Sequence, residues 1–183
     1  MSRRGLALVL LAMTFGASPV RAGCDDPPAP GVDWNLCLKS RASLAGAHLA
    51  DANFKHAKMA GTNLAGADLV GADLSGATMQ NTSFKSAKLQ NANLSAAFMG
   101  GADFMDAVLT DASLDGTNLP GASFMRADLR GVDLTGAYLV GADFKDAKLD
   151  GARLDAAVLT RARWTNGRIC ATGSVGRCIE EEE

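Results

Sequence analysis

The feature that most constrains this chain is a repeat of five residues, seen clearly in the segment GADLVGADLSGA at residues 66–77. Steps of five from Leu44 to Trp164 meet 25 apolar residues without a break: 16 Leu, five Phe, three Met and one Trp. We call these residues pentad centres. Two residues before the centre stands Ala in 21 pentads, and the exceptions are Thr62, Thr82, Thr117 and Val132. Repetition of this kind is typical of a repeat architecture.

Neither regular element of secondary structure has a period of five. Successive helical residues are rotated by about 100°, so centres five apart would spiral around a helix. In a straight strand an odd step sends alternate centres to opposite faces. Each pentad must therefore contain its own bend, with the centre and the residue two before it pointing inward together. Glycines such as Gly66, Gly71 and Gly76 suit the corner that follows.

Like residues recur every twenty positions, which predicts coils with four sides. One column of centres begins at Leu44 and reads Leu64, Phe84, Phe104, Phe124, Phe144 and Trp164. The next column is Leu throughout, from Leu49 to Leu149. The third is Phe54 followed by Leu, and the fourth begins Met59, Met79, Met99. Stacking at the ~4.8 Å spacing of paired strands puts Phe over Phe, and about six coils make a rod roughly 30 Å long.

The N-terminus predicts a secretory signal. Arg3 and Arg4 precede the apolar run of residues 5–17, and cleavage is expected after Ala22. The alternative of a membrane anchor needs ~20 apolar residues, which is longer than this run. Two further alternatives are a lipid anchor on Cys24, disfavoured by Arg21, and a twin-arginine signal in SRRGLAL. Removal of residues 1–22 leaves 15 basic and 20 acidic residues, a charge of about −5.

Four cysteines stand near the two ends of the chain. Outside the cytosol an even number of cysteines indicates disulfides. Of the three possible connectivities we prefer Cys24 with Cys37 and Cys170 with Cys178, because each closes a short loop at its own end. A zinc site is disfavoured because no CxxC or Cys/His pair has ligand spacing. We expect the disulfide loops, with Trp34 and Trp164, to cover the two ends of the rod.

The units ADLSG, ANLSA and ADLRG resemble the A(D/N)LXX units of the pentapeptide-repeat family. The resemblance implies an all-β fold, a right-handed quadrilateral β-helix. The flanks GVDWNLC and WTNGRICATGSVGRC are similar to those of secreted bacterial members. The expected organisation is therefore a signal at residues 1–22, an N-terminal cap at 23–41, the β-helix at 42–165, and a C-terminal cap with an acidic tail at 166–183.

No constellation of residues predicts catalysis, a cofactor or a metal. His48 and His56 are the only histidines, and both are expected to project outward without a pocket or a positioned partner. We interpret the recurring Asp residues as a consequence of exposure to solvent rather than as paired catalytic carboxylates. They are Asp68, Asp73, Asp103, Asp128, Asp133 and Asp143. We expect a protein that is not an enzyme.

Charge gives no support for a nucleic-acid partner, because the chain has no basic patch. Members of the family's quinolone-resistance group resemble a DNA duplex in size and charge and bind gyrase. Such mimicry needs an acidic face. Here Lys85, Arg126, Lys145 and Arg163 cancel the acidic residues on the side of the Phe column, and basic residues also interrupt the all-Leu side. We therefore do not expect a gyrase binder or any nucleic-acid partner.

The side of the Met column differs from the others because it carries few charges. Its outward apolar residues are Phe98, Pro120, Tyr138, Val140 and Val158. Scattered apolar residues are ordinary on a surface, but grouped on one side they can form a contact patch. The sequence thus predicts a periplasmic or secreted interaction scaffold, with an unknown protein partner or a second copy and no stable membrane insertion. The alternative is a structural rod without a dedicated ligand.

Overall fold

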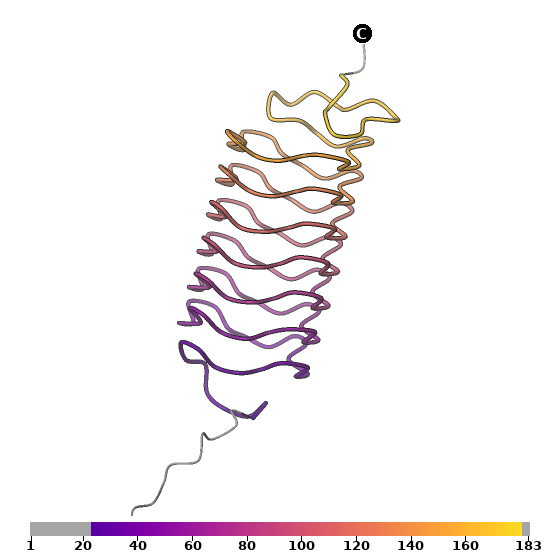
Figure 1. Ribbon diagram of the computed structural model, residues 1–183. Coiled ribbons are helices and arrows are strands. Elements are labelled where there is room, and N and C mark those ends of the chain that lie inside the picture. Colours follow the sequence, from indigo (N-terminus) through magenta and orange to yellow (C-terminus); the bar gives the residue numbers. More distant parts are fainter. Residues whose placement is uncertain (1–22, 181–183) are drawn as a thin grey trace, which may run out of the picture.

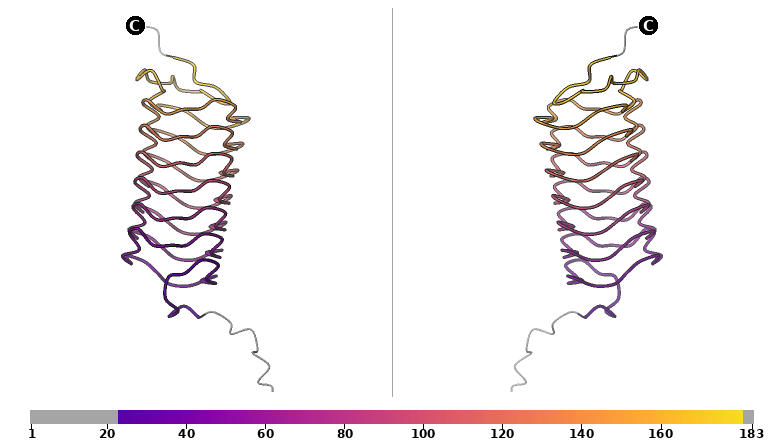
Figure 2. Two further views of the ribbon diagram at one scale, coloured as in Figure 1. Left: turned by 90° about the vertical axis from the view of Figure 1, so that its left-hand side faces the viewer. Right: turned by 90° about the vertical axis from the view of Figure 1, so that its right-hand side faces the viewer.

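The computed structural model describes residues 23–180, so the expected signal at residues 1–22 and the tail residues 181–183 lie outside the part described. The chain winds as a stack of coils into a rod, with a short segment at its N-terminal end and a looped cap at its C-terminal end (Figure 1). Side views show the same regular stacking (Figure 2). Across residues 23–180 the β structure consists of single bridges, and no helix is long and apolar enough to cross a membrane.

Parallel bridges join residues twenty positions apart, from Asp33 with Asn53 to Asp143 with Arg163. The bridge residue always stands directly before a pentad centre and points outward. Each step adds three backbone hydrogen bonds, as when Leu64 N–H donates to the carbonyl oxygen of Ser83 at 2.7 Å. These bonds satisfy the backbone groups that the coil leaves unpaired within itself.

We name the four sides by their residues. The Phe side has the centres from Leu44 to Trp164, and the Leu side has those from Leu49 to Leu149. The Met side has Met59, Met79, Met99, Leu119, Leu139 and Leu159. The Asx side has Trp34, Phe54 and the leucines to Leu154, and is named for the Asp and Asn residues that precede its centres.

The ladder begins before Ala42, where the sequence pattern placed its start. Val32 and Trp34 already occupy inward positions, and Trp34 is only 1% exposed. The pattern is hidden because the next centre is Lys39, a charged residue. Its Nζ lies 3.9 Å from the centroid of the Trp34 ring, so the ammonium group rests on an aromatic face while the stem packs inward.

Each corner is a tight turn with a left-handed residue. The carbonyl oxygen of Leu64 accepts a hydrogen bond from Ala67 N–H at 3.0 Å, and Gly66 between them has a φ of 67°. A positive φ at the third residue of a turn favours Gly or Asn. Other corners adopt the same conformation without glycine, for example Asn81 at 54° and Arg126 at 56°, at a cost of about 1 kcal/mol each.

The interior consists of stacked like residues, as the twenty-residue recurrence predicts. Phe84, Phe104, Phe124 and Phe144 are fully buried, with successive ring centroids 4.7, 4.9 and 5.0 Å apart and the rings nearly parallel. Trp164 continues this column, tilted on Phe144 at 5.6 Å. A buried side chain of this size contributes ~1.5 to 3 kcal/mol, and it does so only when the neighbouring coil covers it.

Three inward threonines replace alanine without leaving a buried hydroxyl unpaired. Thr62 Oγ1 donates to the carbonyl oxygen of Lys39 at 2.8 Å, and Thr82 Oγ1 donates to that of Met59 at 2.9 Å. Thr117 Oγ1 lies 2.7 Å from the carbonyl oxygen of Leu114. The hydroxyl therefore binds a backbone carbonyl of the coil below or of its own turn, which explains why Thr is tolerated here.

The disulfides join the pairs preferred from the sequence. Cys24 and Cys37 have Cα atoms 5.4 Å apart, and Cys170 and Cys178 have Cα atoms 5.0 Å apart. At the C-terminal end, antiparallel bridges pair Val175 with Val158 on the Met side and Ile169 with Arg163 on the Phe side. The C-terminal cap therefore pairs with the last coil on these two sides.

Candidate interaction face

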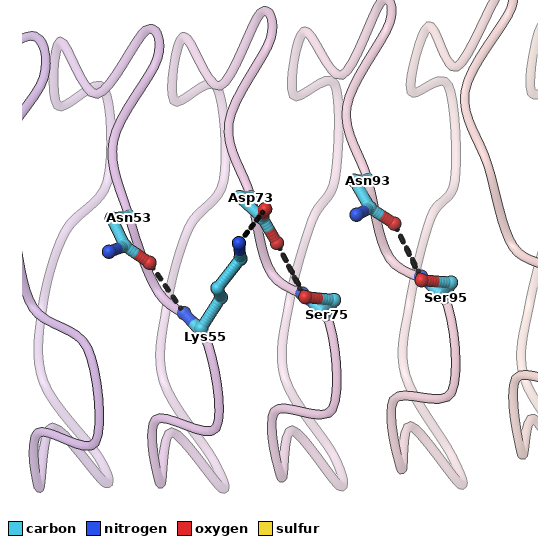
Figure 3. Close-up of polar contacts among 6 residues, drawn as sticks. All are labelled: Asn53, Lys55, Asp73, Ser75, Asn93 and Ser95. Carbon is cyan, nitrogen blue, oxygen red and sulfur yellow. Dashed lines mark hydrogen bonds and ion pairs between the residues drawn. The ribbon is translucent and has the colours of Figure 1, made fainter.

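A polar turn recurs on three sides of the rod, on five coils of the Asx side, three of the Phe side and two of the Leu side. The side chain before the centre accepts a hydrogen bond from the N–H group two residues later. Figure 3 shows this on three successive coils of the Asx side: Asn53 binds Lys55, Asp73 binds Ser75, and Asn93 binds Ser95, each at 3.1 Å. A side-chain oxygen thus holds the start of the corner, as in an Asx turn.

This turn corrects our interpretation of the repeated aspartates. Exposure to solvent was the reason given from the sequence, but all six of those carboxylates also accept the N–H bond of the corner. The six acceptors are Asp68, Asp73, Asp103, Asp128, Asp133 and Asp143. The sequence did contain a signal for this turn. Asn replaces Asp in several pentads at the position before the centre, and the feature that the two side chains share is an acceptor oxygen.

Several of these carboxylates also form ion pairs along the ladder. Lys55 Nζ lies 3.1 Å from Asp73 Oδ2, and Lys85 Nζ lies 3.1 Å from Asp103 Oδ2 (the first pair in Figure 3). Arg126 reaches down one coil to Asp106 at 2.7 Å. The basic members are about half exposed, so screening by solvent leaves each pair little net effect on stability. The pairing leaves these sides with charges of both signs rather than an acidic surface.

Hydrogen bonds lower the pKa of several of these carboxyl groups. For Asp73, burial raises the pKa, but the bonds from Ser75 and the ion pair with Lys55 together outweigh it, and the pKa lies below its ordinary value. For Asp133, the bond from Thr135 is the largest effect and lowers the pKa. These carboxylates are ionised at neutral pH. They accept the N–H bond of the turn, and they form ion pairs with basic residues of a neighbouring coil.

The Met side lacks this pattern. Its outward column reads Leu38, Lys58, Thr78, Phe98, Asn118, Tyr138 and Val158. Between Thr78 and Thr160 no outward residue of this side is charged, and none of its described residues forms an ion pair. Phe98 and Tyr138 are 52% and 44% exposed, two coils apart on one ladder.

The other predicted members of this face lie beside that ladder. Pro120, Val140 and Val158 are half-buried, and Val158 lies one coil beyond Tyr138 on the ladder. Leu38, at the foot of the same column, is 72% exposed and was not predicted as part of this face. Counting back twenty residues from Lys58 would have found it. The structure thus places Phe98, Tyr138 and Val158 in one outward column. Pro120 and Val140 directly follow the pentad centres Leu119 and Leu139.

Glycines line the corner of the Met side. Gly100 and Gly101 follow one centre, and Gly121 and Gly141 occupy the left-handed corner of the next two coils. A Cβ atom added at Gly100 would approach Pro120 Cγ to 3.3 Å. The small residues leave the backbone accessible next to two projecting rings. We call the surface formed by Phe98, Pro120, Tyr138, Val140, Val158 and these glycines the Met face.

The two histidines do not form a shared site. His48 stands in the bridge column of the Leu side, whereas His56 occupies a corner of the Asx side, and both are exposed. Within residues 23–180, no three His, Cys, Asp or Glu side chains gather closely enough to hold a metal ion.

Comparison with known proteins identifies the family. Residues 47–124 match the family model described as "Pentapeptide repeat region". Residues 137–163 match the family model described as "Pentapeptide repeats (8 copies)". A pentapeptide repeat protein from the thylakoid lumen of Arabidopsis thaliana is 31% identical in sequence with a TM-score of 0.51, over 59% of this chain and 81% of that one. The chain therefore belongs to the pentapeptide-repeat family, and its fold is a right-handed quadrilateral β-helix. No curated protein matches the sequence.

Other solved structures are similar at lower levels. HetL, a pentapeptide repeat protein involved in heterocyst differentiation regulation from the cyanobacterium Nostoc sp. strain PCC 7120, is 25% identical over 77% of this chain and 87% of its own, with a TM-score of 0.29. A trypsin-treated variant of QnrB1, a plasmid-mediated fluoroquinolone resistance protein, is 18% identical over 79% of this chain and 92% of its own, with a TM-score of 0.41.

Proposed function

We propose that this protein is a non-enzymatic interaction scaffold that works in the periplasm or outside the cell and binds a protein partner, or a second copy, through the Met face. The observation that carries the proposal is the contrast between sides. Three sides present paired charges and Asx turns, whereas the Met face presents two exposed rings, half-buried aliphatic residues and glycines over successive coils.

The chemistry of the Met face suits a protein surface. Aromatic rings that project from a rigid backbone bury much apolar area and lose little conformational entropy on binding. The partly buried residues near them add apolar surface, and Asn118 and Thr78 supply hydrogen-bonding groups at its centre and edge. Lys58 and Arg161 lie beyond the uncharged stretch, so charge is confined to the rim, as it is in many interfaces.

Two observations support the compartment. The structure holds two disulfides, which persist in oxidising spaces. The similar protein from Arabidopsis is a lumenal protein. Together with the signal-like N-terminus, these features favour export to the periplasm or the medium.

A non-enzymatic role is supported by how the polar groups are used. Asp73, Asp103 and Asp133 are held by turns and ion pairs, and the histidines lie on different sides. General acid-base chemistry would need such groups to converge at a pocket. The rod instead repeats one structural motif along its length.

Introduction of negative charge on the Met face tests this function. The double variant Phe98→Asp and Tyr138→Asp keeps every inward residue, so the rod should fold and melt as the parent does. We expect a crosslinked band formed in the native extracytoplasmic compartment to disappear. Sedimentation of the purified protein measures whether that band is a second copy.

A matched control places the same charges elsewhere. Val108→Asp and Met125→Asp introduce two carboxylates at outward positions of the Leu and Phe sides. The proposal requires this control to keep the crosslinked band. If neither double variant changes crosslinking or sedimentation, the protein is better described as a structural rod without a dedicated ligand. Inhibition of gyrase supercoiling by the purified protein would instead indicate DNA mimicry.

A further inference from the structure

The chain leaves the coil so that, within residues 23–180, no further coil pairs with the last pentads of the Leu and Asx sides. After Trp164 it reverses, with Gly167 N–H donating to the Trp164 carbonyl at 2.9 Å and Trp164 N–H donating to that of Arg168 at 2.7 Å. Gly167 has a φ of 86°, which the reversal requires. The returning segment pairs Ile169 with Arg163 on the Phe side. The last pentad of the Leu side, residues 147–151, is therefore not followed by another coil.

Three backbone groups of that pentad are left open. Among residues 23–180, nothing forms a hydrogen bond with the N–H groups of Leu149 and Gly151 or with the carbonyl oxygen of Ala147. One coil lower, the corresponding groups are all bonded. Leu129 and Gly131 donate to the next coil at 2.9 and 3.0 Å, and the carbonyl oxygen of Ala127 accepts a bond of 3.0 Å. The edge thus repeats the donors and acceptor of an internal ladder step.

A pocket lies along the same edge. It has a volume of about 450 Å³ and is lined by Ala147, Lys148, Leu149, Asp150, Trp164 and Thr165. Leu149 and Trp164 are partly buried, whereas Leu129 and Phe144, their counterparts one coil lower, are fully buried. The pocket therefore combines an incompletely covered piece of the core with unpaired strand groups.

We propose that this edge binds an extended segment of another protein as one added pentad. The ligand has a small residue, any residue and a large apolar residue in sequence, and runs parallel to residues 147–151. The coil below shows the chemistry, because Ala127 and Leu129 point inward while Asp128 points outward. Strand addition of this kind gives affinity through the backbone and specificity through alternate side chains. Lys148 and Asp150 balance in charge, so the segment need not be charged.

A synthetic peptide tests the site directly. The probe has the sequence of residues 126–132 with blocked ends, and the full mature protein is labelled with 15N. We expect saturable shifts of the Leu149 and Gly151 amide resonances, and slower hydrogen exchange of these two amides. N-methylation of the peptide at the residue corresponding to Asp128 removes the donor to Ala147, so it should weaken binding about tenfold.

Two further comparisons separate the edge from other surfaces. Thr165→Trp fills the pocket and should abolish the shifts. Thr110→Trp, which also follows a centre but lies lower on the Leu side, should retain them. The proposal fails if Leu149 and Gly151 do not shift up to about 5 mM peptide, or if the N-methylated peptide binds equally well. Concentration-dependent protection of these amides without peptide would assign the edge to a second copy and overturn the choice of a different partner.

Discussion

A single side chain before each centre links the local turn to the charge of the surface. On the Asx side, Asn53, Asp73 and Asn93 stand one above another, and all three hold the same N–H group (Figure 3). Only Asp73 adds an ion pair, with Lys55. Because the neighbours are amides, the side-chain oxygen rather than the charge is what the turn requires.

Replacement of Asp73 separates these two contributions. Asp73→Asn keeps the acceptor and should change the free energy of unfolding at pH 7 by less than ~0.5 kcal/mol, because the lost ion pair is exposed. Asp73→Ala removes the acceptor and should cost ~1 kcal/mol. Chemical denaturation of both variants measures the difference. Equal costs would show that the turn bond contributes nothing.

Acid should destabilise the rod through these carboxylates. The pKa values of Asp73, Asp128 and Asp133 lie below the ordinary 3.8. A carboxyl group with a lowered folded-state pKa stabilises the fold fully above its unfolded pKa, and this stability is lost as the pH falls through the folded value. We expect the loss to begin below about pH 4. Asp73→Asn should lose less stability than the parent between pH 5 and about pH 2, measured by thermal melting.

The pentad is the element that buries the core, and its centre should be far less tolerant than its turn. Leu109 is fully buried in the middle of the Leu side, and Thr110 follows it in the corner. Leu109→Asp buries an unpaired charge and should cost several kcal/mol, enough to unfold the middle of the rod. Thr110→Asp should cost less than ~0.5 kcal/mol. Circular dichroism and melting check both, and unchanged melting of Leu109→Asp would contradict the inward assignment.

The C-terminal cap is a second kind of element, because it is tied down by a covalent bond and by side chains. Glu180 accepts bonds of 2.7 Å from Asn166 and Arg168, next to the Cys170–Cys178 disulfide. We expect the double variant Cys170→Ser and Cys178→Ser to lose ~2 to 3 kcal/mol by the loop-entropy estimate. Melting and sedimentation of this variant test whether the loop protects the end. No change in either would mean that the rest of the cap is sufficient.

At the scale of the whole molecule, the rod should tolerate removal of a complete coil but not of part of one. Deletion of residues 87–106 joins Ser86 to Ala107 and keeps every column in register, since bridge partners are twenty residues apart. We expect a cooperative, folded protein that has lost no more than a few kcal/mol. Deletion of residues 87–91 turns all later coils by one side, so Leu109 would lie over Phe84. That variant should aggregate or melt without cooperativity, as followed by calorimetry.

Much of this architecture could be predicted because like apolar residues recur every twenty positions along each column. The Phe column gave the stacking of Phe84, Phe104 and Phe124 directly. The start of the ladder could not be predicted, because Lys39 stands at a centre and only its position over Trp34 makes that possible. The Asx turn was missed because both Asp and Asn also suit solvent. The open edge at residues 147–151 depends on the chain reversal at Gly167. The five-residue repeat does not predict this reversal.

The twenty-residue spacing of the bridges also decides how the Met face can be studied. Phe98, Tyr138 and Val158 are neighbours on its surface but are spread over sixty residues of sequence. Its epitope is therefore discontinuous. Under the proposed function, we expect short peptides cut from this chain not to compete for the Met face. Antibodies raised against denatured protein should not block it, whereas antibodies selected on the intact rod should.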